Sequence, residues 1–255
     1  MDYMNRKCKS LLPVMAFVLL SGLQIGGNTV LAQGMGMGQR SSLPEIPVKG
    51  DTTRTLSRYF IEGNTAKKTP DANGFIQRWM VLEPVKKNIS RNSVFTDEYL
   101  RTNLAADNFS ADFSMVPKKG ETVKVGDSQL KWYAVDTKTF NFNLFHFTYA
   151  INKPNFGILV WLVTVINCPE EIKDVRMTAG SNSASMWWLN GQEAMILSGD
   201  RDMIADNVTS QRLTLKKGKN IIRGGVMNGP GMANFCVRFL DEKGAPVKNF
   251  SISYE

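Results

Sequence analysis

The stretch SASMWWLNGQEAMIL, Ser183–Leu197, decides the fold class of this chain. Its Asn190-Gly191 pair lies between two apolar runs, and this dipeptide is the strongest short signal for a two-residue β-hairpin, because both central residues of a type I′ turn need positive φ. Adjacent residues of a strand point to opposite faces of a sheet. We therefore expect Trp187 to join the core and Trp188 to face solvent, a loop or a ligand.

Short runs rich in aromatic and β-branched residues recur along the chain, separated by Gly, Asn, Asp and Pro, as is typical of strands. Their spacing predicts an all-β fold, an antiparallel β-sandwich with at most one or two short helices. One helix is expected over Thr96–Leu104, with Thr96 as its N-cap. Besides the hairpin, the expected strands are 75–82, 121–125, 129–135, 144–151, 158–166, 175–179, 212–215, 220–227, 235–240 and 250–254.

The first 32 residues have the pattern of a secretory signal peptide, with a basic start, an apolar run over 11–23 and small or aliphatic residues before a cleavage site after Ala32. The apolar run is short for a membrane span. Residues 33–58 are rich in Gly, Ser and Pro and predict a flexible linker or N-terminal arm. A single β-sandwich domain is expected over 59–255. The chain is expected to be secreted or periplasmic, and it could associate with the cell surface.

The charge of the whole chain is +8, and it falls to about +6 once the signal peptide is cleaved. The basic residues are scattered, and no arginine stripe with interleaved aromatics points to nucleic acid. No cofactor motif is present either. The pattern therefore favours a secreted chain that has no membrane span after cleavage and no nucleic-acid partner.

Two cysteines remain in the mature chain, Cys168 and Cys236. In an oxidising compartment they could form one disulfide, and two buried thiols in neighbouring strands are an equal alternative. No Cys/His spacing suggests zinc. The loop "GDRDMIAD" gathers three carboxylates that are weak candidates for a structural calcium ion, but it lacks the glycine and the final glutamate of an EF-hand, and ordinary ion pairs are favoured. These carboxylates are Asp200, Asp202 and Asp206.

Hydrolase motifs are weak. "VGDSQL" contains a Gly-Asp-Ser block around Ser128, but a serine nucleophile needs a histidine, and His146 is the sole histidine of the chain. A hairpin turn is the better interpretation of this block. "GSNSAS", around Ser183, lacks the second glycine of a nucleophile elbow. No catalytic residue is therefore assigned.

Aromatic side chains are the remaining route to function, because sugar rings stack their C–H faces on Trp and Tyr while their hydroxyls bind nearby polar groups. Packing in a large core is the competing role for each ring. The candidate carbohydrate contacts are Trp188, Trp132, Tyr133 and Trp79.

The segment from Val175 to Val247 resembles the galactose-binding-like β-sandwich (a jelly roll) that accompanies secreted polysaccharide-degrading enzymes. It is similar to the N-terminal accessory domains of acetylxylan esterase-type proteins. The motifs that carry the resemblance are "WLNG" at 188–191, "RDMIAD" at 201–206, "LKKGKN" at 215–220 and "RFLDEKGAP" at 238–246. Over Phe75–Ile166 the resemblance is weaker, and it includes no esterase domain.

The resemblance implies a secreted, non-catalytic module that binds carbohydrate or supports plant-polysaccharide (xylan) degradation, with a glycan ligand and, in such an assembly, a partner enzyme. Two alternatives stay open at this point. One is a carbohydrate esterase acting on acetylated xylan, and the other is a structural or protein-docking module.

Overall fold

The computed structural model describes residues 53–255, so the predicted signal peptide and most of the predicted arm lie outside the described residues. The described part is mostly β with two antiparallel sheets, as predicted, and it has three short α-helices where at most two were expected. The helices are α1 (Leu56–Tyr59), α2 (Asp97–Ala106) and α3 (Leu144–Ala150), and a 3-10 turn, η1, spans Asn92–Val94. No described helix has the length and apolarity that crossing a bilayer requires.

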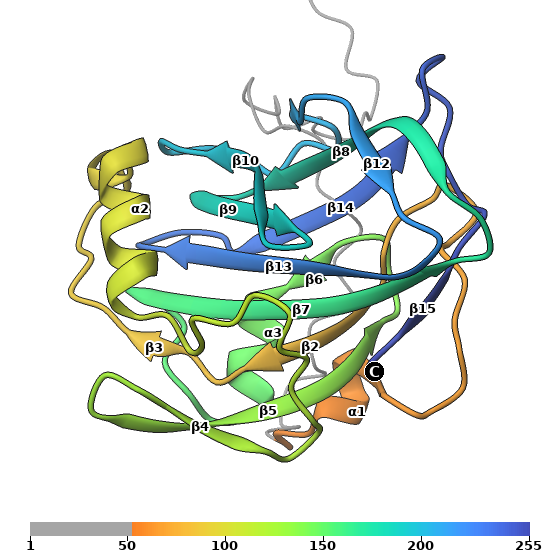
Figure 1. Cartoon of the computed structure of the whole chain (residues 1–255). Helices are drawn as coiled ribbons and strands as arrows, with labels where there is room; N and C mark the ends of the chain where they lie inside the picture. Colours follow the sequence, from red (N-terminus) through yellow and green to blue (C-terminus); the bar gives the residue numbers. More distant parts are fainter. Residues whose placement is uncertain (1–52) are drawn as a thin grey trace, which may run out of the picture. The chain divides into compact units, whose positions relative to one another are not determined.

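The larger sheet has ten strands, with the path β1-β5-β2-β7-β13-β9-β10 and with β3, β4 and β15 attached to β7 or β5 (Figure 1). Its strands are β1 (Phe60–Glu62), β2 (Arg78–Leu82), β3 (Val85–Lys86), β4 (Thr122–Val125), β5 (Ser128–Thr137), β7 (Ile158–Cys168), β9 (Ala184–Leu189), β10 (Gln192–Leu197), β13 (Gly218–Asn228) and β15 (Ser251–Ser253). The smaller sheet contains β6 (Phe142–Asn143), β8 (Ile172–Ser181), β11 (Val208–Thr209), β12 (Leu213–Leu215) and β14 (Asn234–Leu240).

The larger sheet is buried on both faces. One face packs on the smaller sheet and forms the first core, to which β8 and β14 contribute Met177, Phe235 and Phe239. The other face forms a second core with α2, which supplies Leu100 and Leu104. This explains why β7, "ILVWLVTVI", is a continuous apolar run, since a strand covered on both faces has no need of polar alternation.

The Asn190-Gly191 hairpin is confirmed. Leu189 pairs with Gln192 across a two-residue turn, and the turn residues have φ of 51° and 82°. These are the positive values that a type I′ turn requires. The "GDS" block is likewise a hairpin turn, with Val125 paired to Ser128. The other predicted strands are present in the structure with shifted ends, except the one over 144–151.

The predicted strand over 144–151 is wrong, because these residues form α3. Asn143 caps the helix by accepting a hydrogen bond from the backbone N–H of His146. The buried side chains, Leu144, Phe147 and Thr148, recur at helical spacing. The apparent alternation of Phe145 and Phe147 around the histidine is therefore a misleading signal. The predicted N-cap of α2 is confirmed, since the Thr96 side chain accepts from the Tyr99 N–H.

Candidate functional site

The three tryptophans predicted to contact a sugar are buried. Trp79 and Trp132 have no exposed surface, and Trp188 is 8% exposed. Trp79 lies in the first core, and the other two lie in the second. A sugar ring needs an open aromatic face, so none of these three rings is accessible to a sugar as the structure places them. Trp188 does lie on the face opposite Trp187, and what covers it is a loop, whose Phe113 ring centroid is 5.6 Å away.

Tyr133, the fourth predicted residue, is half-buried and belongs to a polar cluster. Its hydroxyl donates to Oε1 of Glu83 at 3.2 Å, and Nζ of Lys153 lies 3.2 Å from Oε2 of the same carboxylate. Burial, together with the negative charge of Glu83, raises the pKa of Tyr133 to about 12. The phenol therefore keeps its proton at neutral pH and remains a hydrogen-bond donor.

Helix α3 presents aromatic rings on its outer side. Phe145, His146 and Tyr149 are half-exposed there, and Phe156 follows in the next loop. We call these four residues the α3 aromatic surface. Phe156 is 50% exposed, and it is the one aromatic residue among the exposed large hydrophobic side chains of the described chain. Its ring lies 5.0 Å from that of Phe145 at an interplanar angle of 73°.

The same surface carries cationic and aromatic neighbours. The guanidinium of Arg54 lies 4.9 Å from the Tyr149 ring centroid. His146 stacks on Tyr59 with centroids 4.2 Å apart, and burial lowers the pKa of this imidazole. At neutral pH the stacked histidine is therefore an uncharged ring.

The polar cluster around Glu83 and the α3 aromatic surface flank the same helix. The Lys153 backbone N–H donates to the Thr148 carbonyl at 2.8 Å, at the end of α3. Tyr133 packs edge-on against Phe147 of α3, with centroids 5.6 Å apart. Sequence reasoning missed most of this arrangement, because interpreting the segment as a strand hid the fact that residues 145, 146 and 149 share one helical face.

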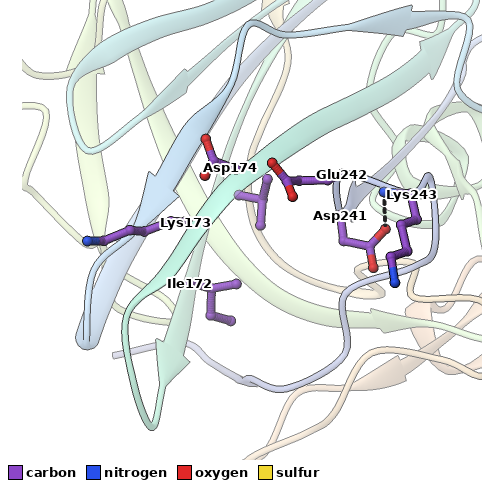
Figure 2. Close-up of a pocket in the computed structure, with 7 residues that line it drawn as sticks. Ile172, Lys173, Asp174, Asp241, Glu242 and Lys243 are labelled. Carbon is purple, nitrogen blue, oxygen red and sulfur yellow. Dashed lines mark hydrogen bonds between the residues drawn. The ribbon is translucent and has the colours of Figure 1, made fainter.

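A shallow pocket of about 240 Å³ lies at the end of β8 that is remote from the turn into β9 (Figure 2). Asp174 occupies positive φ there, where the register between β8 and β12 shifts. Its carboxylate and that of Glu242 share Arg212, whose Nη1 is 3.9 Å from the first and 2.7 Å from the second. The pocket is lined by Ile172, Lys173, Asp174, Val175, Asp241, Glu242 and Lys243. It offers polar groups but no ring on which a sugar could stack.

The calcium candidates are not arranged around an ion. Among the described residues, no group of three or more His, Cys, Asp or Glu side chains could hold a metal. Asp206 instead pairs with Arg238, whose Nε is 2.9 Å from Oδ1, and this ion pair together with the Thr178 hydroxyl lowers the pKa of the carboxyl. Asp200 accepts a hydrogen bond from Asn92 at 2.7 Å. The three carboxylates therefore do not act as one set of ligands.

The two cysteines are free and buried in this structure, so the disulfide considered above is not formed. Cys168 belongs to β7 of the larger sheet, and Cys236 belongs to β14 of the smaller one. Burial raises the pKa of both thiols, that of Cys236 to about 12. A thiol that keeps its proton is a poor nucleophile.

Within residues 53–255, the histidine does not contact a serine through a side-chain hydrogen bond. The His146 ring packs instead on Tyr59. Ser183 is buried and donates to Oδ1 of Asn228 at 2.9 Å. Ser128 begins β5 at the tip of an exposed hairpin. The described residues therefore hold no Ser–His pair of the kind that ester hydrolysis by a serine nucleophile uses.

Some solved structures are remotely similar to this chain. The PA14 domain of the MpAFP antifreeze protein is 10% identical, with a TM-score of 0.44, and the match covers 76% of this chain and 96% of that one. The PA14 sugar-binding domain from an RTX adhesin is 11% identical, with a TM-score of 0.40 and coverage of 71% and 100%. The epithelial adhesin 9 A domain from Candida glabrata, solved with Galb1-4GlcNAc, is 10% identical, with a TM-score of 0.34 and coverage of 76% and 96%.

No protein-family model matches the chain, and no curated protein matches it. The structural similarities are remote, and they assign neither a ligand nor a site to this chain.

Proposed function

We propose that this chain is a secreted, non-catalytic carbohydrate-binding module that works beside enzymes degrading plant polysaccharides such as xylan. The observation that carries the proposal is the α3 aromatic surface, which lies beside the Glu83–Lys153–Tyr133 cluster. It is the place in the described chain where accessible rings and hydrogen-bonding groups flank one helix.

The chemistry of this surface suits a sugar. A pyranose ring presents C–H groups that pack on an aromatic face, and Phe156 and Phe145 offer two faces at a steep angle. Sugar hydroxyls both donate and accept hydrogen bonds, and the half-exposed ammonium group of Lys153, which is paired with the buried Glu83 carboxylate, can donate one. Exposed apolar groups rimmed by polar ones are typical of interaction sites. The contacts are few, so we expect weak binding to single sugars and stronger binding to polymers.

The proposed role is binding without catalysis. We expect purified mature protein to hydrolyse neither p-nitrophenyl acetate nor acetylated xylan faster than its Ser128→Ala variant. A hydrolysis rate that depends on Ser128 or His146 would establish the esterase alternative instead.

Affinity electrophoresis through gels containing xylan, arabinan, galactan or glucomannan tests binding directly. We expect retardation in at least one gel. Phe156→Ala and Tyr149→Ala should each weaken binding by about 5- to 150-fold, if sugar stacking resembles base–aromatic stacking at about 1–3 kcal/mol per ring.

The matched control is Ile61→Ala, which removes an equally exposed apolar side chain, 51% against 50%, from strand β1. Retardation that is unchanged in Phe156→Ala and Tyr149→Ala, or lost equally in Ile61→Ala, would remove the α3 aromatic surface as the site. The absence of retardation in every gel would favour the protein-docking alternative.

A further inference from the structure

Arg223, in the middle of β13, is a buried cation that forms no close salt bridge among the described residues, although the exposed Asp112 carboxylate interacts with it electrostatically. Its side chain is 1% exposed, and its hydrogen bonds go to Oδ1 of Asn108 and to the backbone carbonyls of Ser110 and Asp112, at 3.2, 2.9 and 2.7 Å. Its Nε is buried without a hydrogen-bond partner in the described chain. Burial lowers the pKa of this guanidinium to about 10. A buried charge without a close ion-pair partner is costly, so its presence calls for an explanation.

The surroundings of Arg223 are aromatic. The rings of Phe109 and Phe113 both lie 4.2 Å from the guanidinium carbon. On the neighbouring strand β9, Trp188 is the direct register partner of Arg223, so the two side chains emerge side by side from the same face of the sheet. Phe113 covers this tryptophan, with ring centroids 5.6 Å apart.

Phe113, which covers Trp188, also lies against the tip of the Asn190-Gly191 hairpin. A Cβ atom added to Gly191 would lie 3.3 Å from Cβ of Phe113. Phe113 therefore lies against both the Trp188 ring and the hairpin tip at Gly191.

The segment Ser110–Met115 that carries Phe113 has no regular secondary structure, and Ala111, Asp112 and Ser114 are exposed. Its own polar bonds are local, from Ser114 to Asp112 and from Asp112 N to Ser110. Lifting it would break the two carbonyl bonds to Arg223, the contacts of Phe113 with Trp188 and Arg223 and the packing of Met115 on the second core, but no strand pairing. Segments with few buried contacts are those that open at low cost.

We propose that Ser110–Met115 is a lid, and that beneath it Arg223 and Trp188 bind one hexuronic acid unit of an acidic polysaccharide. The carboxylate takes the place of the Ser110 and Asp112 carbonyls on the guanidinium, and the sugar ring takes the place of Phe113 on Trp188. The proposal rests on the proposed carbohydrate-binding function for its class of ligand, but it uses a surface distinct from α3.

The choice of a uronic acid follows from charge and shape. The planar guanidinium fork matches a carboxylate in two parallel hydrogen bonds, which are stronger than those to neutral carbonyls. Binding of a neutral sugar would break the hydrogen bonds from Arg223 to the two carbonyls and would supply no negative charge in return. In a uronic acid the carboxylate is attached directly to the ring, which suits an arginine and a tryptophan that stand on adjacent strands.

Isothermal titration with trigalacturonate and with its fully methyl-esterified form separates charge from ring shape. We expect the acid form to bind at least about tenfold more tightly than the ester. The binding should also speed hydrogen exchange of the amides of residues 110–115. Equal binding of the two forms, or unchanged exchange in the lid, overturns the proposal, and both measurements use the native chain.

Two variants test the parts. Phe113→Ala should raise the affinity for trigalacturonate severalfold, because the lid then competes less well for Trp188, whereas a purely structural Phe113 would only lower stability. Arg223→Gln should abolish the preference for the acid form, while Arg212→Gln, a matched surface arginine, should keep it. If Arg223→Gln fails to fold, the affinity of Phe113→Ala for trigalacturonate and the acid-over-ester preference of the native chain still test the proposal.

The lid site and the α3 aromatic surface can be tested separately. Trigalacturonate binding should depend on Arg223 and Phe113, whereas retardation by a neutral polysaccharide should depend on Phe156. Retardation by a neutral polysaccharide that depends on Phe156, with no binding of trigalacturonate, would sink the lid proposal and leave the proposed function standing.

Discussion

Trp187 and Trp188 are neighbours in β9, yet their rings lie in different cores. The Trp187 ring is 5.8 Å from that of Trp79 in the first core, and the Trp188 ring is 5.8 Å from that of Trp161 in the second. The period-two alternation of a strand produces this separation. The stretch "WW" is therefore a sign of a sheet covered on both faces, and not of one ring exposed to solvent.

Replacing Trp187 by Ala should destabilise the fold by about 3–5 kcal/mol, the usual range for emptying a large aromatic site. Its ring is fully buried and its indole N–H donates to the Ser185 hydroxyl at 2.9 Å, so both packing and a hydrogen bond are lost. Urea unfolding followed by circular dichroism measures the change.

Trp188→Ala should destabilise the fold less than Trp187→Ala does, because the loop that carries Phe113 can settle into part of the space left. A larger loss for Trp188→Ala than for Trp187→Ala would show that the second core, and not the first, dominates stability.

Gly191→Val should lower the free energy of unfolding by roughly 1–2 kcal/mol, since a β-branched residue is strained at φ of 82°. The new side chain would also press on Phe113. Gly191→Asn is the control, because asparagine tolerates positive φ, and it should cost less than Val. Equal unfolding midpoints for Val and wild type would contradict the turn geometry.

Arg78 and Asp136 form a buried ion pair between β2 and β5. Nε and Nη2 of the arginine lie 2.8 and 2.9 Å from the two carboxylate oxygens, and the Tyr254 hydroxyl donates to the same carboxylate at 2.9 Å. Asp136→Ala leaves the buried cation uncompensated and should cost about 3–5 kcal/mol in urea unfolding.

The control is the exposed pair formed by Glu62 and Lys119, whose side chains are 69% and 53% exposed. Glu62→Ala should leave the unfolding midpoint unchanged, because solvent screens such pairs. A comparable loss of stability in Asp136→Ala and Glu62→Ala would mean that burial does not increase the contribution of the Arg78–Asp136 pair.

Much of the sheet structure could be predicted from the sequence, because turns and caps are local. The Asn190-Gly191 turn and the Thr96 cap each depend on a few adjacent residues. Helix α3 could not be predicted in this way. Its run of seven residues is too short for periodicity to separate helix from strand. The deciding features are the Asn143 cap and the packing of Phe147 under Tyr133.

The candidate site was harder to predict than the fold for the same reason. From the sequence alone, Trp132 and Trp188 could be expected at the surface. The sequence does not reveal that α2 and the loop after it cover the second face of the larger sheet and bury both rings. Glu83 and Lys153 are 70 residues apart in the chain and meet only in the folded structure. Phe156 gives no signal beyond being an aromatic residue in a loop between Asn155 and Gly157.

Near neutral pH, the change of the free energy of unfolding with pH should come from His146, the sole histidine of the chain. Burial lowers its pKa below the ordinary value of 6.5, so the unfolded chain takes up a proton at a higher pH than the folded chain does. Stability is therefore fully present above about pH 6.5 and falls as the pH is lowered through that value towards the folded-state pKa. Carboxyl groups whose pKa is lowered in the folded state, such as that of Asp206, lose their contribution to stability only near and below pH 3.8, outside this window.

Urea unfolding midpoints measured at about pH 7.5, 6.5 and 5.5 should decline in the wild type and stay nearly level in His146→Phe, whose ring can still stack on Tyr59. An equal decline in both proteins would assign the pH dependence to other groups and contradict the burial of a neutral imidazole against α1.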